Sequence, residues 1–218
     1  MRVLIACEYS GVVRDAFTRL GHDAVSVDLL PSESEGNHII GDVLDVIKSQ
    51  KFDLMIAHPP CTDLAVSGAK WFAEKRADGR QQRALEFVRA LLNAPIARIA
   101  LENPVSVISS YIRKPDQIIQ PWMFGHEATK TTCLWLKGLP LLRSTNIVDR
   151  GERHITKSGR SLPKWYNLPP SADRWKLRSA TFTGIAQAMA EQWGTEDNAY
   201  QFNPVSYTHL RAHETDSY

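Results

Sequence analysis

Residues 2–28, RVLIACEYSGVVRDAFTRLGHDAVSVD, decide the fold class of this chain. The first six of them form an almost continuous apolar run, which is typical of a parallel strand covered on both faces. After Gly11, apolar residues recur at helical spacing until Gly21, and residues 23–28 then have the pattern of a second strand that ends in an acid. A strand, a helix and a strand in so short a stretch predict a right-handed βαβ unit.

The same alternation continues along the chain. Further strands are expected at residues 52–57, 97–101 and 131–136, and further helices at residues 43–48, 80–92 and 180–193. Strands that alternate with helices predict an α/β protein, with a Rossmann-like, mostly parallel sheet and helices on both faces. Ligands of such sheets bind at the carboxyl ends of the strands.

Composition bounds the protein class only loosely. The 218 residues include 26 Lys and Arg against 24 Asp and Glu, so the net charge indicates no partner. No apolar run reaches the length of a membrane span, and the first residues are too short an apolar segment for a signal peptide. Cys7, Cys61 and Cys133 lack C-x-x-C spacing, so we expect neither disulfides nor a metal site. A reducing cytoplasm fits this use of cysteine.

The chain divides into parts of different character. We expect one domain over residues 1–203, in which residues 137–179 form a basic insert. Residues 204–218 form a tail with no apolar period or cap, and the sequence resembles a translated sequencing-library adapter. We therefore expect this tail to be non-native and leave it out of the functional reasoning.

The first βαβ unit has features of a nucleoside-cofactor site. Its turn contains Gly11 but no G-x-G-x-x-G pattern, which disfavours a dinucleotide. Asp28, at the end of the second strand, can accept both hydroxyls of a ribose, and Asp42 can accept from an adenine amino group. The alternative is that Asp28 is a strand terminus and Asp42 a helix N-cap.

A thiol directly follows two prolines at the end of the strand expected at residues 52–57. Pro59 and Pro60 fix φ and remove two N–H donors, so the chain leaves the sheet stiffly extended and presents Cys61 above the strand ends. A lone cysteine is usually a small core residue. We accept that interpretation for Cys7 and Cys133, which fall inside apolar strands, but polar neighbours disfavour it for Cys61.

Four stretches, in order, resemble motifs of DNA cytosine-5 methyltransferases. The stretch ending in Pro59-Pro60-Cys61 resembles the motif that supplies their nucleophile, and Glu102-Asn103-Pro104 resembles their Glu-Asn-Val motif. Residues 6–28 resemble the first two cofactor motifs, and residues 181–186 resemble a degenerate form of the last motif. The resemblance covers most of residues 1–193 and is closest to small, often phage-encoded proteins of this type. It implies the fold of an S-adenosylmethionine-dependent methyltransferase and a bacterial or phage-infected host cytoplasm.

The resemblance implies a role for each matching residue. Cys61 would add to C6 of cytosine, which makes C5 nucleophilic toward a methyl sulfonium. Glu102 would hold or protonate N3, and Asn103 would brace the loop carrying Glu102. S-adenosylmethionine would be held by Glu8, Ser10, Gly11, Asp28, Asp42, Pro59, Thr183 and Gly184.

Two departures from the family bear on the substrate. Residues 128–133 replace the family's Gln-x-Arg-x-Arg strand, which leaves Lys130 as the cationic stand-in. The large target-recognition domain is also missing. In its place, residues 137–179 contain ten basic and three acidic residues, interleaved with aromatic ones. Such a surface suits DNA phosphates with little base reading; the alternative is an ordinary solvated loop. The candidate nucleic-acid contacts are Arg150, Arg153, Lys157, Arg160, Lys164 and Trp165.

Two other functions remain open at this point. The missing recognition domain is compatible with C5 modification of a free pyrimidine nucleotide or of RNA. The altered 128–133 stretch is compatible with a non-catalytic relative that binds cofactor or nucleic acid. DNA binding that weakens steeply with salt would favour the DNA enzyme over the nucleotide enzyme.

Overall fold

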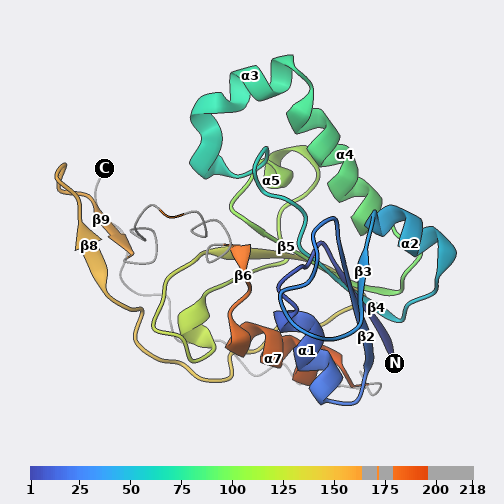
Figure 1. Cartoon of the computed structure of the whole chain (residues 1–218). Coiled ribbons are helices and arrows are strands. Elements are labelled where there is room, and N and C mark those ends of the chain that lie inside the picture. The colour runs from blue at the N-terminus through green and yellow to red at the C-terminus, as the bar shows by residue number, and fades with distance from the viewer. Residues whose placement is uncertain (164–170, 172–178, 196–218) are drawn as a thin grey trace.

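A computed structural model describes residues 1–163, 171 and 179–195. Its elements form a large sheet with helices on either side and a separate small hairpin (Figure 1). In chain order they are β1 (Arg2–Ala6), α1 (Val12–Arg19), β2 (Asp23–Asp28), β3 (His38–Ile40), α2 (Val43–Ser49), β4 (Leu54–Ala57), η1 (Val66–Trp71), α3 (Phe72–Ala77), α4 (Arg80–Leu92), β5 (Arg98–Pro104), α5 (Ile108–Tyr111), β6 (Gln117–Ile119), η2 (Pro121–Met123), β7 (Thr132–Lys137), β8 (Arg153–Ile155), β9 (Ser161–Pro163) and α7 (Thr183–Trp193).

The large sheet has the strand order β3-β2-β1-β4-β5-β7-β6. Strands β1 to β5 are all parallel, whereas β7 runs antiparallel to both β5 and β6. The order reverses between β1 and β4, which makes this a doubly wound sheet. Because β7 runs the other way, it begins at the edge where the parallel strands end. The predicted Rossmann-like α/β class is confirmed.

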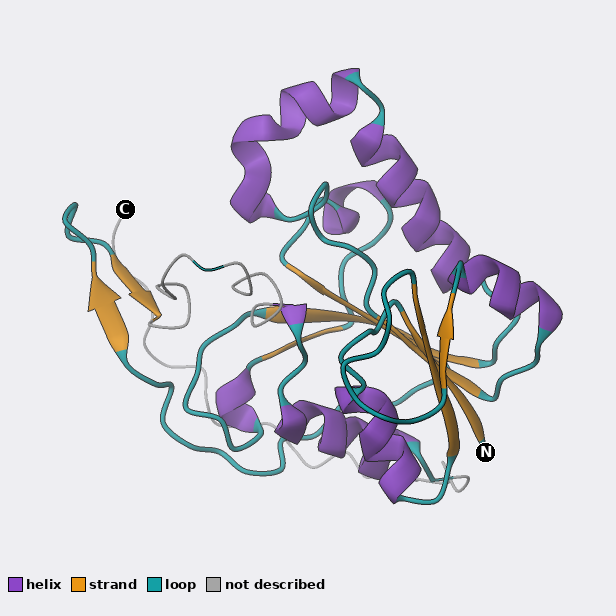
Figure 2. Ribbon diagram, in the orientation of Figure 1, coloured by secondary structure: helices purple, strands orange, loops and turns teal. Residues whose placement is uncertain are grey.

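Helices cover both faces of the sheet (Figure 2). On one face, α1 and α7 pack together over strand residues that include Val3 and Ile5. On the other face, α2 and α4 pack over residues that include Leu4 and Met55. All four of these strand side chains are fully buried. Successive residues of a central strand point into opposite apolar layers. The central strands are therefore unbroken apolar runs, with no alternation of apolar and polar residues.

Most expected elements are found with small shifts of their ends. Strand β5 continues three residues further than expected, to Pro104, so Glu102 and Asn103 lie inside the strand rather than after it. The ladder extends this far because the two residues pair with Leu134 and Cys133 of β7. Helix α7 begins at Thr183, three residues later than expected, because residue 182 is still extended as its N-cap.

Other elements were not predicted. Between Cys61 and α4 the chain forms η1 and α3, which stand at the end of α4 in Figure 1. Within the basic insert, β8 and β9 form an antiparallel hairpin whose strands are mostly exposed. Residues 204–218, the expected non-native tail, lie outside the described residues. In the part that the structure describes, no helix is both long and apolar enough to cross a membrane.

Candidate functional site

The thiol loop leaves the sheet at the end of β4. The His58 N–H donates to the carbonyl of Ala6 at 2.9 Å, which continues the β1–β4 pairing by one residue. The chain then passes through Pro59 and Pro60 to Cys61, whose side chain is exposed. The Cys61 carbonyl accepts from the N–H groups of the following turn, at 3.0 Å from Leu64 and 2.8 Å from Ala65. The loop is therefore an ordered turn that presents its thiol outward.

Asn103 holds this loop against the neighbouring strand. Its side-chain Nδ2 donates to the Pro59 carbonyl at 2.9 Å, and the residue is 1% exposed. We expected Asn103 to brace a loop that carries Glu102, and that expectation is wrong. Glu102 needs no such brace because it lies within β5, and the bracing contact goes to the loop of Cys61 instead.

Glu102 faces the start of the same loop. Because Ala57 pairs with Leu101, the next residues on the two strands, His58 and Glu102, lie side by side. His58 Nδ1 is 3.1 Å from Glu102 Oε2, and the two side chains are only 12% and 15% exposed. Burial favours a raised pKa for the Glu102 carboxyl, but the hydrogen bond and charge of His58, with the charge of Lys130, hold that pKa below its ordinary value.

Lys130 lies close enough for its charge to act on this carboxylate. Its role as the cationic stand-in stays a prediction. Its Nζ is 3.4 Å from the Ala180 carbonyl and 5.8 Å from the centre of the Phe182 ring. The residue precedes β7, and the reversed direction of β7 brings it to the carboxyl edge of β5. The structure thus brings Glu102, Lys130 and the Cys61 loop to one edge of the sheet.

The ends of β1, β2 and β3 meet at a second corner of that edge. Burial, followed by the charges of Asp28 and Asp42, raises the pKa of the Cys7 thiol to about 12, so both carboxylates lie near it. We expected Cys7 inside an apolar strand, and that placement is wrong. Cys7 follows β1 and adopts a left-handed backbone with φ 59°.

Glu8, Ser10 and Gly11 form the turn into α1. The buried Glu8 carboxylate accepts from the N–H of Val13 at 2.7 Å, the N–H of Arg14 at 3.1 Å, and Ser10 Oγ at 3.3 Å. It therefore occupies the positive end of the helix itself. Gly11 has φ 76°, which explains why glycine is needed there.

Asp28 and Asp42 have the structural contacts that were the alternative to cofactor binding. Asp28 Oδ1 accepts from the Leu30 N–H at 2.9 Å, and Asp42 Oδ1 accepts from the Leu44 N–H at 2.8 Å as the N-cap of α2. Each contact uses one oxygen. Within residues 1–163 and the other described parts, no hydrogen bond or ion pair reaches the second oxygen of either carboxylate. That oxygen is compatible with a ligand, and cofactor binding by the two residues stays a prediction.

Arg14 was missed by sequence reasoning. Its guanidinium is 1% exposed and donates to Ser26 Oγ at 3.2 Å, Ser32 Oγ at 3.1 Å and the Glu35 carbonyl at 2.8 Å. These contacts tie α1 to the segment that follows Asp28. The only sequence signal was a lone basic residue beside the apolar stripe of α1.

Thr183 and Gly184 open α7, and both lie against His126. His126 Nε2 accepts from the Gly184 N–H at 2.9 Å and lies 3.3 Å from Thr183 Oγ1. A hydrogen bond of 2.8 Å joins Tyr9 of the β1–α1 turn to Ser179. Ser179 therefore lies against the β1–α1 turn, and cofactor binding by Thr183 and Gly184 stays a prediction.

Four of the six candidate nucleic-acid contacts lie in or before the β8–β9 hairpin. The Arg150 guanidinium lies 5.2 Å from the centre of the Trp122 ring. Arg153 donates across the hairpin to Ser161 Oγ at 2.7 Å, and Lys157 and Arg160 are exposed at its tip. Lys164 and Trp165 lie outside the described residues.

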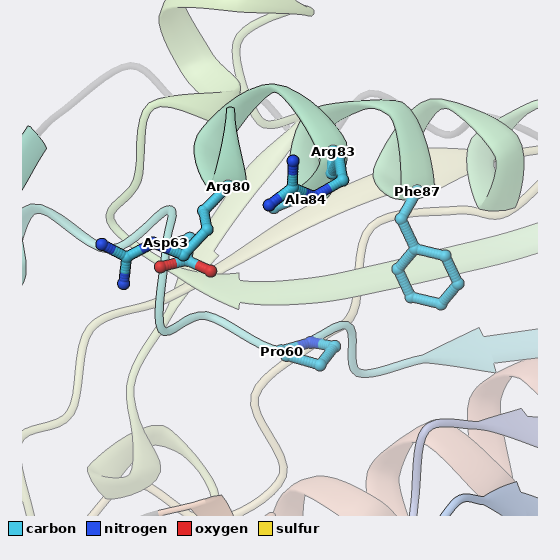
Figure 3. A pocket seen from close by; sticks show the side chains of 6 residues that line it. All are labelled: Pro60, Asp63, Arg80, Arg83, Ala84 and Phe87. Carbon is cyan, nitrogen blue, oxygen red and sulfur yellow. The ribbon is translucent and has the colours of Figure 1, made fainter. Parts of the chain in front are cut away.

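A cavity lies behind the thiol loop, next to the start of α4 (Figure 3). It has a volume of about 210 Å³ and is lined by Pro60, Asp63, Arg80, Arg83, Ala84 and Phe87. Figure 3 shows Asp63 and Arg80 at one end and Phe87 at the other, with Pro60, Arg83 and Ala84 between them. Arg80 is already paired with Glu74 at 2.6 Å and with Asp78 at 2.7 Å, so its charge is balanced within the protein.

Comparison with known proteins gives a distant structural similarity. No protein-family model matches the chain, and no curated protein matches it. A solved structure of a candidate DNA modification methyltransferase encoded within an E. coli prophage is similar at a TM-score of 0.46 and 16% identity. The match covers 69% of this chain and 53% of that one, so this chain spans about half the length of that protein.

Proposed function

We propose that this chain transfers a methyl group from S-adenosylmethionine to C5 of cytosine in DNA, through a covalent adduct of Cys61. The observation that carries the proposal is the contact between β5 and the thiol loop. Asn103 fixes Pro59, two residues before the thiol, and Glu102 beside it contacts His58 of the same loop. An exposed thiol and a nearly buried carboxylate are thereby held at one sheet edge, where α/β sheets bind their ligands.

The corner at β1, β2 and β3 supports the cofactor assignment. Asp28 and Asp42 both act on Cys7, so two carboxylates from neighbouring strand ends converge there, each with an oxygen left for a ligand. Asp28 would accept the ribose hydroxyls, and Asp42 would accept an adenine amino group. The polar atoms present fit a nucleoside without a pyrophosphate. When bound, S-adenosylmethionine supplies an electrophilic methyl group.

The reaction uses Cys61, Glu102 and Lys130, which lie where β4, β5 and β7 meet at the sheet edge. The Cys61 thiolate adds to C6 of a cytosine turned out of the DNA stack, and the adduct makes C5 nucleophilic. Glu102 contacts N3 and carries the proton that neutralises charge on the ring. Lys130 balances the carboxylate beside it. After C5 is methylated, solvent water takes up the C5 proton, which expels the thiolate and restores the aromatic ring.

The assignment to DNA rests on the basic insert. Arg153, Lys157 and Arg160 present their charges on an exposed hairpin, and Arg150 lies over an aromatic ring. Arginine and lysine side chains of this kind suit phosphate contacts. So small a hairpin offers little surface for base edges, so we propose weak sequence specificity.

The test is transfer of label from methyl-labelled S-adenosylmethionine by the full chain. Cytosine-containing DNA, RNA and free pyrimidine nucleotides are offered in parallel, and digestion of the product locates the label. We expect label at C5 of DNA cytosine, with none above background for Cys61→Ala. The matched control Cys133→Ala, which removes a buried thiol, should remain active. Label on RNA or on the nucleotide alone would overturn the assignment to DNA and keep the methyl transfer. No label on any of the three would overturn the whole proposal.

A trapping experiment tests the covalent step separately. DNA with 5-fluorocytosine cannot lose a proton from C5 after methylation, so the adduct should persist. We expect a protein–DNA complex that survives denaturation with the wild-type chain and not with Cys61→Ala. Methylation without a trapped complex would show that the thiol does not add to the ring.

A further inference from the structure

His58 and Glu102 form a nearly buried pair at the proposed catalytic corner. Nδ1 of His58 is 3.1 Å from Oε2 of Glu102. The other ring nitrogen, Nε2, is also buried, and it has no hydrogen-bond partner among the described residues. A buried polar atom without a partner costs about 1–3 kcal/mol, so a structural hydrogen bond alone does not explain an imidazole here.

The charged groups around this pair come from three elements. His58 belongs to the loop after β4, Glu102 to β5, and Lys130 precedes β7. The Cys133 thiol of β7 also lies near Glu102, whose charge adds to the effect of burial in raising the pKa of that thiol. Cys133 is therefore a neutral neighbour, and the charge of Lys130 adds to the effect of His58 in holding the pKa of the Glu102 carboxyl below its ordinary value. Among these groups His58 is the imidazole, the side-chain type that most often transfers protons in catalysis.

An ionised Glu102 raises a chemical question for the proposed reaction. Protonation of cytosine N3 requires an acid, yet both the contact with His58 and the charge of Lys130 stabilise the carboxylate form. A carboxylate can accept a hydrogen bond but has no proton of its own to give. The proton must therefore come from a group in contact with Glu102.

We infer that His58 is the proton source for Glu102, so that the two residues work as a relay between the thiol loop and cytosine N3. This inference rests on the proposed function. It makes His58 a positioning residue that acts through Glu102, with Glu102 as the group that touches the base. His58 in the thiol loop and Glu102 in β5 then serve one task, the protonation of cytosine N3.

The proton balance of the relay is simple. In the starting state His58 is an imidazolium with protons on both nitrogens, and Glu102 is a carboxylate. As Cys61 adds to C6, the Nδ1 proton of His58 passes to Oε2 of Glu102, and Glu102 gives a proton to N3. The carboxylate is thereby restored, and His58 becomes neutral with its remaining proton on Nε2. When the thiolate leaves after loss of the C5 proton, N3 returns its proton along the same path.

His58→Gln is the variant that separates proton supply from hydrogen bonding. A glutamine amide can still donate to Glu102, but it carries no proton that titrates. We expect single-turnover methyl transfer to fall by about 100-fold, within the range typical of a lost general acid. The Kd for DNA should change by less than about threefold. His22→Gln, which removes a histidine before β2 at the opposite edge of the sheet, is the matched control and should leave the rate unchanged.

The pH profile distinguishes the relay from a merely structural role. For the wild-type chain the rate should fall as pH rises and the pair loses its proton, because only the protonated pair can supply N3. His58→Gln should lose this alkaline limb while the acidic limb, due to the thiol, stays. His58→Asn provides a second amide variant should His58→Gln not fold, as judged by circular dichroism.

The outcomes separate this inference from the proposed function. An active wild-type chain whose rate and alkaline limb survive in His58→Gln would overturn the relay and leave the proposed function standing. A wild-type chain that transfers no methyl group would overturn both. A readout without activity comes from the ¹³C NMR titration of the Glu102 carboxyl. We expect its pKa below the ordinary range in the wild type and higher in His58→Gln; an equal value in both would also count against the relay.

Discussion

The three cysteines illustrate how the surroundings of a side chain, rather than its type, set its chemistry. Cys61 is exposed on a polar turn, Cys133 is buried in β7, and Cys7 lies near two carboxylates. Burial and those carboxylates raise the pKa of Cys7 to about 12, so it stays a thiol at neutral pH. Only the thiolate is nucleophilic, so proximity to the proposed cofactor site does not make Cys7 reactive.

Alkylation by iodoacetamide should therefore be selective. At pH 8 we expect Cys61 to be modified at least about tenfold faster than Cys7 or Cys133, because a raised pKa leaves few thiolates and burial limits access. Peptide mass spectrometry of samples quenched over time measures the three rates. Modification of Cys7 as fast as Cys61 in the folded chain would contradict this description of the β1 corner. Unfolding in urea, the control, should make the three rates similar.

At the scale of elements, the turn between β1 and α1 depends on Gly11. Its φ of 76° lies in the left-handed region, and a Cβ there would overlap Ser34 Oγ and the Arg14 guanidinium. Arg14 cannot move aside easily because its hydrogen bonds hold it buried. The turn and the segment after Asp28 are thus packed against each other through one arginine.

Gly11→Ala and Gly21→Ala form a matched pair that tests this packing. Gly21 also has a positive φ, 81°, but a Cβ there would meet nothing within 4 Å. We expect Gly21→Ala to lower the free energy of unfolding by about 1 kcal/mol through backbone strain alone. Gly11→Ala adds the overlap and should cost about 2–4 kcal/mol. Urea unfolding followed by circular dichroism measures both, and equal losses would refute the packing argument.

How far the sequence predicts this molecule depends on how local each feature is. The strands at β1, β2 and β4 and the helix α4 follow from apolar spacing, so they were predicted closely. The extension of β5 through Glu102 was not, because it depends on pairing with β7, whose direction no local pattern encodes. For the same reason the contact between His58 and Glu102 was missed: it requires the register of β4 against β5. Lys130 was found by family resemblance, and its closeness to Glu102 follows from the reversed β7.

At the scale of the whole molecule, the basic insert and the sheet edge that holds the proposed catalytic residues belong to different parts of the structure. The β8–β9 hairpin forms its own two-stranded sheet and extends to one side of the large sheet (Figure 1). The proposed catalytic residues belong to strands and loops of the large sheet. Changes of charge in the hairpin should therefore alter affinity for DNA without altering the chemistry.

Replacing Arg153, Lys157 and Arg160 together by glutamine tests this separation. We expect the slope of log K against log salt to become shallower by about 1 for each phosphate that the variant no longer neutralises. Fluorescence anisotropy with labelled DNA at several salt concentrations measures the slope. The control replaces three exposed lysines of other segments, Lys48, Lys51 and Lys114, by glutamine. Slopes that fall equally in both triple variants would contradict a specific role for the hairpin.

The hairpin tip also offers a practical opening for engineering. Its turn closes through a hydrogen bond between Thr156 and Arg160 at 2.9 Å, so the chain enters and leaves at nearly the same point. A Cβ on Gly159 at the tip would meet nothing within 4 Å. Such exposed turns accept inserted domains well, provided the guest has neighbouring termini. A sequence-reading module spliced between Lys157 and Gly159 would leave the large sheet intact, and under the proposed function the composite protein would be a programmable tool for marking chosen sites in a genome.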